Sequence, residues 1–485
     1  MLAERVSPAV PPSSGRAPQL NIASRRVSRL VDELDQYYRS FAPLFPREAQ
    51  AHWAHKYLEG QLLDLERKSI EPMAAALTGG NIQAMQQVIS DSRWSDEAVI
   101  EIHQSLVAQT LGRADGVLIL DGCDFPKQGQ DSVGVARQYC GALGKVANCQ
   151  ASVVLAYASE VGFTLVDRRL YLPAEWFKPE WHERWQRCGI PDTVTFRTRP
   201  ELGGEMLRTV CARAVLPFQW VVMDEGFGKS PRLLNQIQAE NRWFFAEMPR
   251  ITRAWRQRPH VVRPTPGPHG RPPTRMHLAP GASPAQRVDD LAAAWPRSAW
   301  HTFIIHEGSK GPVQVEIAAV RVVMAEDDLP GRDEWLIVRR RHTPQPRAEW
   351  KFYRSNAPAN VSLKTLARLT AWRWPVETVI EECKGELGLD QYEVRSWRGW
   401  HHHTTLTLLS HHFLVRLRVQ MGHDAPALTV SQVRRLLQVT LPKREFDAQA
   451  ALDELARIQR QNYAAYRSHR KRTRYQIQHQ ASPPK

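Results

Sequence analysis

Two aspartates each close a short run of apolar residues. The segment GVLILDG reaches Asp121, and WVVMD reaches Asp224. Short runs rich in Val, Ile and Leu predict buried strands, and ligands of open α/β sheets bind where such strands end. Carboxylate oxygens at that place suit hard cations such as Mg²⁺. Alternatively, each aspartate only ends a strand or begins a turn, and Asp124 and Glu225 are neighbouring carboxylates that could take the same role.

A third set of charged residues lies in TAWRWPVETVIEECKGELGLDQ. Pro375 suits the first position of a helix, where its missing N–H costs nothing. Glu377 then falls in the first turn, where the helix dipole favours a carboxylate. Glu381 and Lys384 follow on the same face, and Arg373 lies just before the helix begins. Taken alone, the segment is also compatible with an ordinary charged helix face.

The spacing of Arg373, Glu377 and Lys384 resembles the signature of DDE insertion-sequence transposases, Y-(2)-R-(3)-E-(6)-K. Thr370 stands at the tyrosine position, which is a departure from that signature. Further blocks look similar in the same order: YLEGQLLDLERKSIE, LDGCDFPKQGQDSVGVARQYC, VVMDEGFGKSPRLL and GLDQYEVRSWRGWHHH. The group that they resemble is the insertion sequence 701 family.

This resemblance implies an RNase H-like catalytic domain in which Asp121, Asp224 and Glu377 hold two Mg²⁺ or Mn²⁺ ions. It implies that Arg373 and Lys384 hold phosphates while DNA strands are cleaved and transferred. The implied partners are double-stranded DNA, as terminal inverted repeats and target, and a second copy of the chain in the paired-end complex. The implied location is the cytoplasm, at the nucleoid.

Two other functions remain open on the sequence. One is a catalytically inactive, DNA-binding relative that acts as a repressor or in a repurposed role. The other is an RNase H-fold nuclease that cleaves DNA without joining ends.

For the first metal ligand, Gly122 follows Asp121 where an acidic residue is common in the family, so we expect Asp121 rather than Asp124.

Mixed α and β segments must position these residues. Helical periodicity dominates both ends of the chain, and strand-like runs fill the middle. A β-rich stretch separates the second carboxylate from the third, and we interpret it as an insertion rather than a continuation of the α/β layer. The expected regions are a disordered leader (1–20), a helical DNA-binding domain (21–112), two parts of the RNase H-like domain (113–249 and 361–420), an Arg/Pro-rich loop with the strand insertion (250–360) and a helical basic tail (421–485).

Charge and composition narrow the partners. The formal net charge is +15, which favours a polyanion, either nucleic acid or an acidic membrane surface. No apolar run is long enough to predict a membrane span. The 6 cysteines form no C-x-x-C pair, which argues against a zinc ribbon and a disulfide framework. We expect the histidines at 401–403 and 411–412 to be structural, because adjacent helical residues point in different directions.

Several residues are candidates for DNA contact, each with a plainer alternative. The segment 250–275 is rich in Arg, Pro and Gly and contains no Asp or Glu. Such a segment could contact DNA phosphates, but a solvated linker would have the same composition. Trp350 could stack on an unpaired base or simply pack in a half-buried strand. The candidates are Lys127, Arg253, Arg256, Arg258, Trp350, Arg470, Lys471 and Arg472.

Overall fold

The fold is taken from a computed structural model of the chain. The leader expected at the N-terminus lies almost wholly outside the described residues, as does part of the arginine-rich loop. The described residues are 4–5, 20–263, 275–308, 311–341, 349–445 and 447–480.

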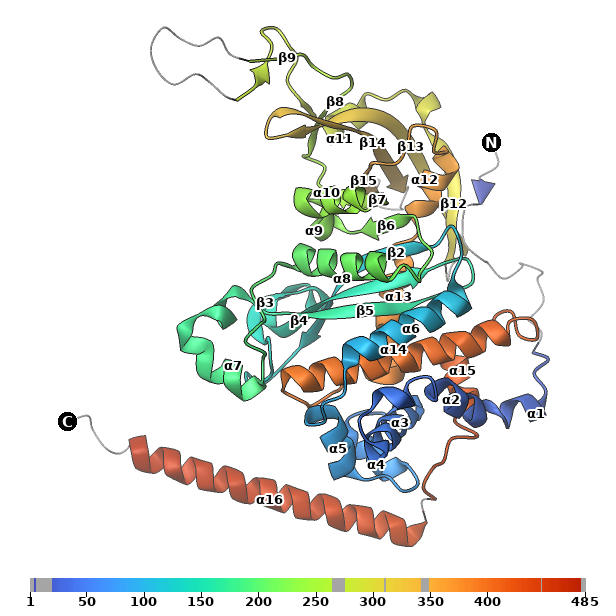
Figure 1. Ribbon diagram of the computed structural model, residues 1–485, viewed down its shortest axis with the longest axis vertical. Coiled ribbons are helices and arrows are strands. Elements are labelled where there is room, and N and C mark those ends of the chain that lie inside the picture. The colour runs from blue at the N-terminus through green and yellow to red at the C-terminus, as the bar shows by residue number, and fades with distance from the viewer. Residues whose placement is uncertain are drawn as a thin grey trace.

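A mixed sheet forms the centre of the molecule (Figure 1). Its first three long strands are antiparallel neighbours in the order β5-β4-β2, and β6 and β7 then continue the sheet parallel to β2. A short strand, β3, pairs with the beginning of β4. The strands are β2 (Val117–Pro126), β3 (Ala136–Cys140), β4 (Lys145–Ala158), β5 (Phe163–Tyr171), β6 (Trp220–Met223) and β7 (Trp243–Met248).

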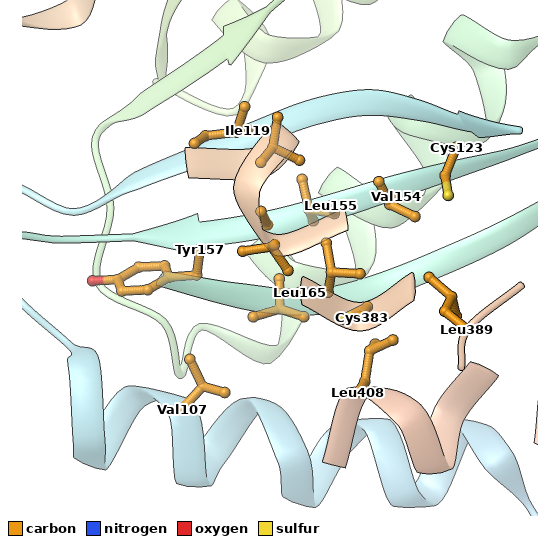
Figure 2. Close-up of a cluster of buried hydrophobic side chains, with 14 of the residues drawn as sticks. Val107, Ile119, Cys123, Val154, Leu155, Tyr157, Leu165, Cys383, Leu389 and Leu408 are labelled. Atoms are coloured by element: carbon orange, nitrogen blue, oxygen red, sulfur yellow. The ribbon is translucent and has the colours of Figure 1, made fainter. Parts of the chain in front are cut away.

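Helices cover both faces of this sheet. A Cβ on Gly203 of α8 would meet the side chain of Leu120, so α8 covers the face that the even-numbered residues of β2 occupy. Figure 2 shows the opposite face, where Ile119 and Cys123 lie with Cys383 of α13 and Leu408 of α14. The helices are α6 (Asp96–Leu111), α8 (Arg199–Arg213), α9 (Glu225–Gly228), α10 (Pro231–Ala239), α13 (Trp374–Leu387) and α14 (Trp397–Gln420), and α7 (His182–Cys188) follows β5 in the chain.

Helix α14 is buried along most of its length because it lies between the sheet and the N-terminal helices (Figure 1). Its polar residues are therefore inside the protein as well as its leucines. Its N-terminus is capped by the Ser396 hydroxyl, which accepts from the Gly399 N–H at 3.1 Å. The N-terminal helices are α1 (Ser24–Val27), α2 (Leu30–Tyr38), α3 (Glu48–Leu62), α4 (Ile70–Ala76) and α5 (Ile82–Ser90).

The strand-rich stretch between the second and third carboxylates is joined to the central sheet, which corrects our expectation of a separate layer. Strand β15 pairs antiparallel with β7, and β14, β13 and β12 follow in order to make one 13-stranded sheet. A second, smaller core lies beneath α11. The elements are β8 (Arg253–Trp255), β9 (Val261–Val262), β10 (His277–Leu278), β11 (Gln286–Arg287), α11 (Val288–Ala293), β12 (His301–Gly308), β13 (Gly311–Glu326), β14 (Leu329–Arg341), β15 (Glu349–Ser355) and α12 (Leu363–Leu369).

Two helices close the chain. Helix α15 (Val430–Leu437) packs against α14, whereas α16 (Ala448–Gln480) extends past the N-terminal helices as a single long rod (Figure 1). Within the described part of the chain, no helix is both long and apolar enough to cross a membrane.

Candidate active site

Asp121 and Asp224 lie side by side where the pairing between two parallel strands stops. Strand β6 ends at Met223, so Asp224 follows a strand end as predicted, but β2 continues to Pro126, so Asp121 lies within its strand and the prediction that it ends that strand was wrong. Leu120 of β2 is in register with Met223 of β6, so the aspartate that follows each of them is the next residue along its strand. Neighbouring strands are about 4.8 Å apart. The two runs of apolar residues therefore place Asp121 and Asp224 next to each other across the sheet.

The Asp121 carboxylate is placed on the α13 face of the sheet. It shares the odd-numbered face of β2 with Cys123, which packs against α13, and its Oδ1 accepts from the Gly122 N–H at 2.8 Å. Burial raises the pKa of Asp121 to about 7, and the negative charges of Asp224 and Glu377 add to that rise while the Arg373 guanidinium opposes it. The site therefore concentrates negative charge beyond what its own cation neutralises.

Asp224 also caps the short turn that follows β6. Its Oδ1 accepts from the Phe227 N–H at 3.1 Å, which fixes the side chain while leaving the second oxygen free of that bond. Glu225 is the first residue of α9 and is exposed. The structure thus gives Asp224, and not Glu225, the position next to Asp121.

Helix α13 brings the third carboxylate toward the same edge. Pro375 stands in its first turn, as predicted, and Arg373 is the residue before its start. The Arg373 guanidinium binds Glu377, with Nη2 at 2.6 Å and Nε at 3.2 Å from Oε1. Its Nη1 lies 3.6 Å from Oε2 of Glu247 on β7. Burial disfavours the guanidinium charge, but Asp121, Glu377 and Glu247 together outweigh it and raise the pKa of Arg373.

Arg373 therefore lies among carboxylates in this structure, whereas the sequence predicted a phosphate contact. The oxygens of Asp121, Asp224 and Glu377 do not all lie within 4.8 Å of one another, as judged over the described residues. Glu377 is instead held by Arg373 and is half exposed.

The other candidate for the first ligand, Asp124, faces away from this edge. Asp124 is three residues from Asp121 along β2, so its side chain is on the α8 face. There its Oδ2 accepts from the Gly141 N–H at 2.6 Å, and Oδ1 lies 3.4 Å from Arg199. The geometry favours Asp121 over Asp124 at the shared edge.

Lys384 connects α13 to β2. Its Nζ donates to the main-chain oxygen of Asp124 at 3.0 Å and lies 5.4 Å from the centre of the Phe125 ring. Glu381, on the same helix face, is exposed. Lys384 thus orients the helix that carries Glu377, a contact that the sequence alone did not indicate.

Thr370, at the tyrosine position of the signature, is buried. Its hydroxyl donates to the Ala367 carbonyl at 2.7 Å, and its own carbonyl accepts from Arg339 of β14 at 3.1 Å. The residue therefore ends α12 and links the strand insertion to the segment that precedes α13.

The candidates for DNA contact lie apart from one another. Lys127 continues β2, roughly 20 Å along the strand from Asp121, with its Nζ 3.7 Å from the centre of the Tyr392 ring. Burial lowers the pKa of Lys127 to about 8. Trp350 on β15 is exposed and packs against Trp300, with ring centres 5.4 Å apart.

Two of the arginine candidates already have acidic partners. Arg253 lies 3.5 Å from Asp328, and Arg258 lies 3.2 Å from Asp333. Arg256, Arg470 and Lys471 are exposed, the last two on α16, and the side chain of Arg472 lies outside the described residues.

The histidines of α14 are buried and hydrogen-bonded, which agrees with the structural role predicted for them. His403 contacts the Tyr57 hydroxyl at 2.7 Å and the Leu389 carbonyl at 3.1 Å. His402 lies between the carbonyls of Ile89 and Trp94. A separate group, Asp35, His55 and Glu59, brings possible metal ligands together, but Lys56 already binds Glu59 at 2.7 Å.

Sequence reasoning missed Glu247. It lies in the strand RWFFAEM, which was predicted, and the signal that would have found it is register. Ala246 of β7 pairs with Met223 of β6, so Glu247 continues the row that Asp121 and Asp224 begin. Three adjacent parallel strands thus each place a carboxylate at the same level of the sheet: Asp121 within β2, Asp224 just after β6 and Glu247 next to the last residue of β7.

Comparison with known proteins gives the class to which this arrangement belongs. A family model described as DDE superfamily endonuclease matches residues 40–312, more than half of the chain. The chain belongs to this superfamily. The match spans Asp121, Asp224 and Glu247 but ends before Arg373 and Glu377, which rest on spacing and geometry.

Among individual proteins, the chain is similar to a probable transposase for insertion sequence element IS701 from Microchaete diplosiphon. The two are 30% identical over 203 residues, which is 42% of this chain and 49% of the relative. The chain therefore spans about half the length of the curated relative that it matches.

Proposed function

We propose that this protein is the transposase of an insertion sequence, which binds the terminal inverted repeats of its element and cleaves and transfers DNA strands. The observation that carries the proposal is the adjacency of Asp121 and Asp224 on neighbouring parallel strands, with Glu377 held beside them by Arg373. The similarity to the IS701 transposase supports it.

The strand order supports an RNase H-like catalytic domain. Three antiparallel strands, β2, β4 and β5, are followed by two strands parallel to the first, in the spatial order β5-β4-β2-β6-β7. Strands β8 to β15 form the insertion between the second and third carboxylates. The helical N-terminal region and the basic helix α16 are proposed to contact DNA beside this domain.

The donor set fits divalent metal ions. Carboxylate oxygens are the ligands that Mg²⁺ and Mn²⁺ prefer, and the raised pKa of Asp121 reflects a buried, crowded group of carboxylates. Asp121, Asp224 and Glu377 would hold two such ions. Ions bound there supply a Lewis acid for the attacked phosphate and lower the pKa of the attacking water or 3′-hydroxyl.

The chain's own cations have separate tasks in this proposal. Arg373, released from Glu377, has a planar guanidinium that suits bidentate contact with a phosphate. Lys384 keeps α13 against β2 and has two further donors for the DNA backbone. Two transposon ends must be brought together, so a homodimer is proposed, acting at the nucleoid in the cytoplasm.

The test is a cleavage and joining assay. The full chain is incubated with Mg²⁺ and DNA that carries the terminal repeats of its own locus. Cleavage at the element ends followed by strand joining supports the transposase. Cleavage without joining indicates the alternative, an RNase H-fold nuclease, and binding without cleavage indicates an inactive DNA-binding relative.

An Asp224→Asn variant is the control for the metal site. Asn caps a helix about as well as Asp, so the bond to Phe227 N–H survives and the fold is preserved. Cleavage that persists undiminished in this variant would sink the assignment of Asp224 as a metal ligand.

A further inference from the structure

Glu247 is a fourth carboxylate near the site, in addition to Asp121, Asp224 and Glu377. It lies in one row with Asp121 and Asp224 across three neighbouring strands. Registers across β2, β6 and β7 match Leu120 with Met223 and Met223 with Ala246. One residue further on, the same register places Asp121, Asp224 and Glu247 in sequence across the sheet. Parallel neighbours in register direct their side chains to the same face, which here is the face of α13.

Glu247 is bound by two cations from two different elements. Lys351 of β15 approaches its Oε1 at 3.2 Å, and Arg373 approaches its Oε2 at 3.6 Å. The Glu247 side chain is only 16% exposed, so solvent screens these pairs less than it screens surface pairs. Glu247 therefore has a fixed place at the edge of the site.

Arg373 contacts two carboxylates, Glu377 closely and Glu247 at a longer distance. Its short contacts are to Glu377, at 2.6 and 3.2 Å, and its longer contact is to Glu247. As long as the guanidinium holds Glu377, that carboxylate is neutralised by a cation of the chain itself. A metal ion that recruits Glu377 must compete with Arg373, and the displaced guanidinium needs another anionic partner close by.

We propose that Glu247 is a positioning residue that receives the Arg373 guanidinium when Glu377 turns to a divalent cation. Arg373 then moves from one carboxylate to the other while it remains in the site, where it can meet a DNA phosphate. The inference rests on the proposed function, because it takes Glu377 as a metal ligand. It adds to that function a fourth carboxylate that acts through Arg373 and contacts no metal.

The test measures Mn²⁺ binding to the full chain, with free Mn²⁺ followed by electron paramagnetic resonance. Glu247→Gln is expected to weaken binding about tenfold, as is usual for partners of metal-binding side chains. The matched control is Glu205→Gln on α8, whose carboxylate pairs with Arg197 at 2.8 Å and should leave Mn²⁺ affinity unchanged.

An Arg373→Gln background separates a role through Arg373 from a direct one. In that background the Glu247→Gln change should have no further effect, because the group that Glu247 receives is gone. A tenfold loss that persists there would overturn the proposal and make Glu247 a direct ligand or a simple source of negative charge. Unchanged affinity in the single Glu247→Gln variant would overturn it too.

The proposed function fails differently from this inference. If Asp224→Asn binds Mn²⁺ as well as the unaltered chain does, the metal site itself is wrong, and the role given to Glu247 falls with it. If Asp224→Asn abolishes binding while Glu247→Gln does not change it, only the role of Glu247 is lost.

Discussion

The acidic row across β2, β6 and β7 (Asp121, Asp224 and Glu247) and the histidines of α14 are two groups of ionisable side chains that differ in how they are buried. In the row, like charges lie beside one another, and the pKa of Asp121 rises to about 7 because of burial and of its neighbours. On α14, His402 and His403 lie against main-chain carbonyls and a tyrosine hydroxyl, and burial lowers the pKa of each to about 4.

This difference is the one expected between a ligand-binding site, here the acidic row, and a structural element, here α14. Buried polar groups that find neutral partners stabilise a fold and stay uncharged. Carboxylates kept together without enough cations destabilise it, and such groups collect where ligands bind. Neutralising a carboxylate of the acidic row should therefore raise the free energy of unfolding, whereas removing an α14 histidine should lower it. The following changes test this difference, from the largest expected effect to the smallest.

Asp121→Asn should abolish cleavage and stabilise the fold. Loss of a metal-binding carboxylate is expected to lower the cleavage rate by about a thousandfold or more, on the scale of losing a main electrostatic contact to the transition state. Because the folded pKa of Asp121 lies above its unfolded value of about 3.9, the ionised group opposes folding above pH 7. Denaturant unfolding at pH 8 should show a gain of about 1 kcal/mol, and a loss would contradict this account of the row.

Acid should destabilise the protein through its buried histidines. The pKa values of His103, His402 and His403 are lowered to about 4, chiefly by burial, whereas an unfolded histidine titrates near 6.5. The unfolded chain thus binds more protons below pH 6.5. Stability is complete above that pH and falls as the pH drops toward 4, by about 1.4 kcal/mol per pH unit for each histidine.

The measurement is denaturant unfolding at several pH values between 5 and 7. Asp121 works in the opposite direction over the same interval, because its folded form takes up a proton there before its unfolded form does. An Asp121→Asn background removes this opposing contribution and should steepen the decline. A flat profile in that background would mean that the histidines are not held neutral by the fold.

His403→Ala should reduce stability and leave metal binding alone. The change removes the imidazole ring that the Tyr57 hydroxyl and the Leu389 carbonyl both contact. Loss of such a buried network costs about 2–3 kcal/mol, measurable by denaturant unfolding. His423, whose side chain is 99% exposed, provides the control: His423→Ala should change neither property. Altered Mn²⁺ affinity in His403→Ala would place α14 within the site after all.

Lys384→Met examines a residue beside the acidic row for which we propose both a structural contact and a DNA contact. Loss of the bond to the Asp124 carbonyl should cost about 1 kcal/mol of unfolding free energy. If Lys384 also contacts a phosphate, the slope of DNA affinity against salt should fall by about one. The exposed Lys145 provides a matched Lys→Met control for stability. A stability loss without a change in slope would confine Lys384 to holding α13 in place.

The sequence alone predicted the parts of the site that local patterns determine. Apolar runs predicted the strands that carry Asp121 and precede Asp224, although β2 continues past Asp121 to Pro126, and Pro375 predicted the first turn of the helix that carries Glu377. Helical spacing predicted a structural role for the α14 histidines, but it did not predict that all five are buried. Each of these depends on neighbours within about ten residues, which a sequence displays directly.

What the sequence could not supply depends on pairing between distant segments. Glu247 enters the row only through the register of β7 with β6, and Asp124 leaves it only because β2 is extended there. The ion pair of Arg373 with Glu247 joins segments 126 residues apart by their numbers. The joining of the strand insertion to β7 likewise rests on three paired residues of β15, for which periodicity has no signal.

That short pairing limits how the protein can be shortened. Strand β7 has β6 on one side and β15 on the other, so the insertion is the sheet's own continuation. Excising it would turn β7 into an open edge, with unpaired N–H and C=O groups ready to join another chain. Lys351, one of the two cations that hold Glu247, would be lost with it. A minimal version of this protein must therefore keep β15 or supply a substitute for it.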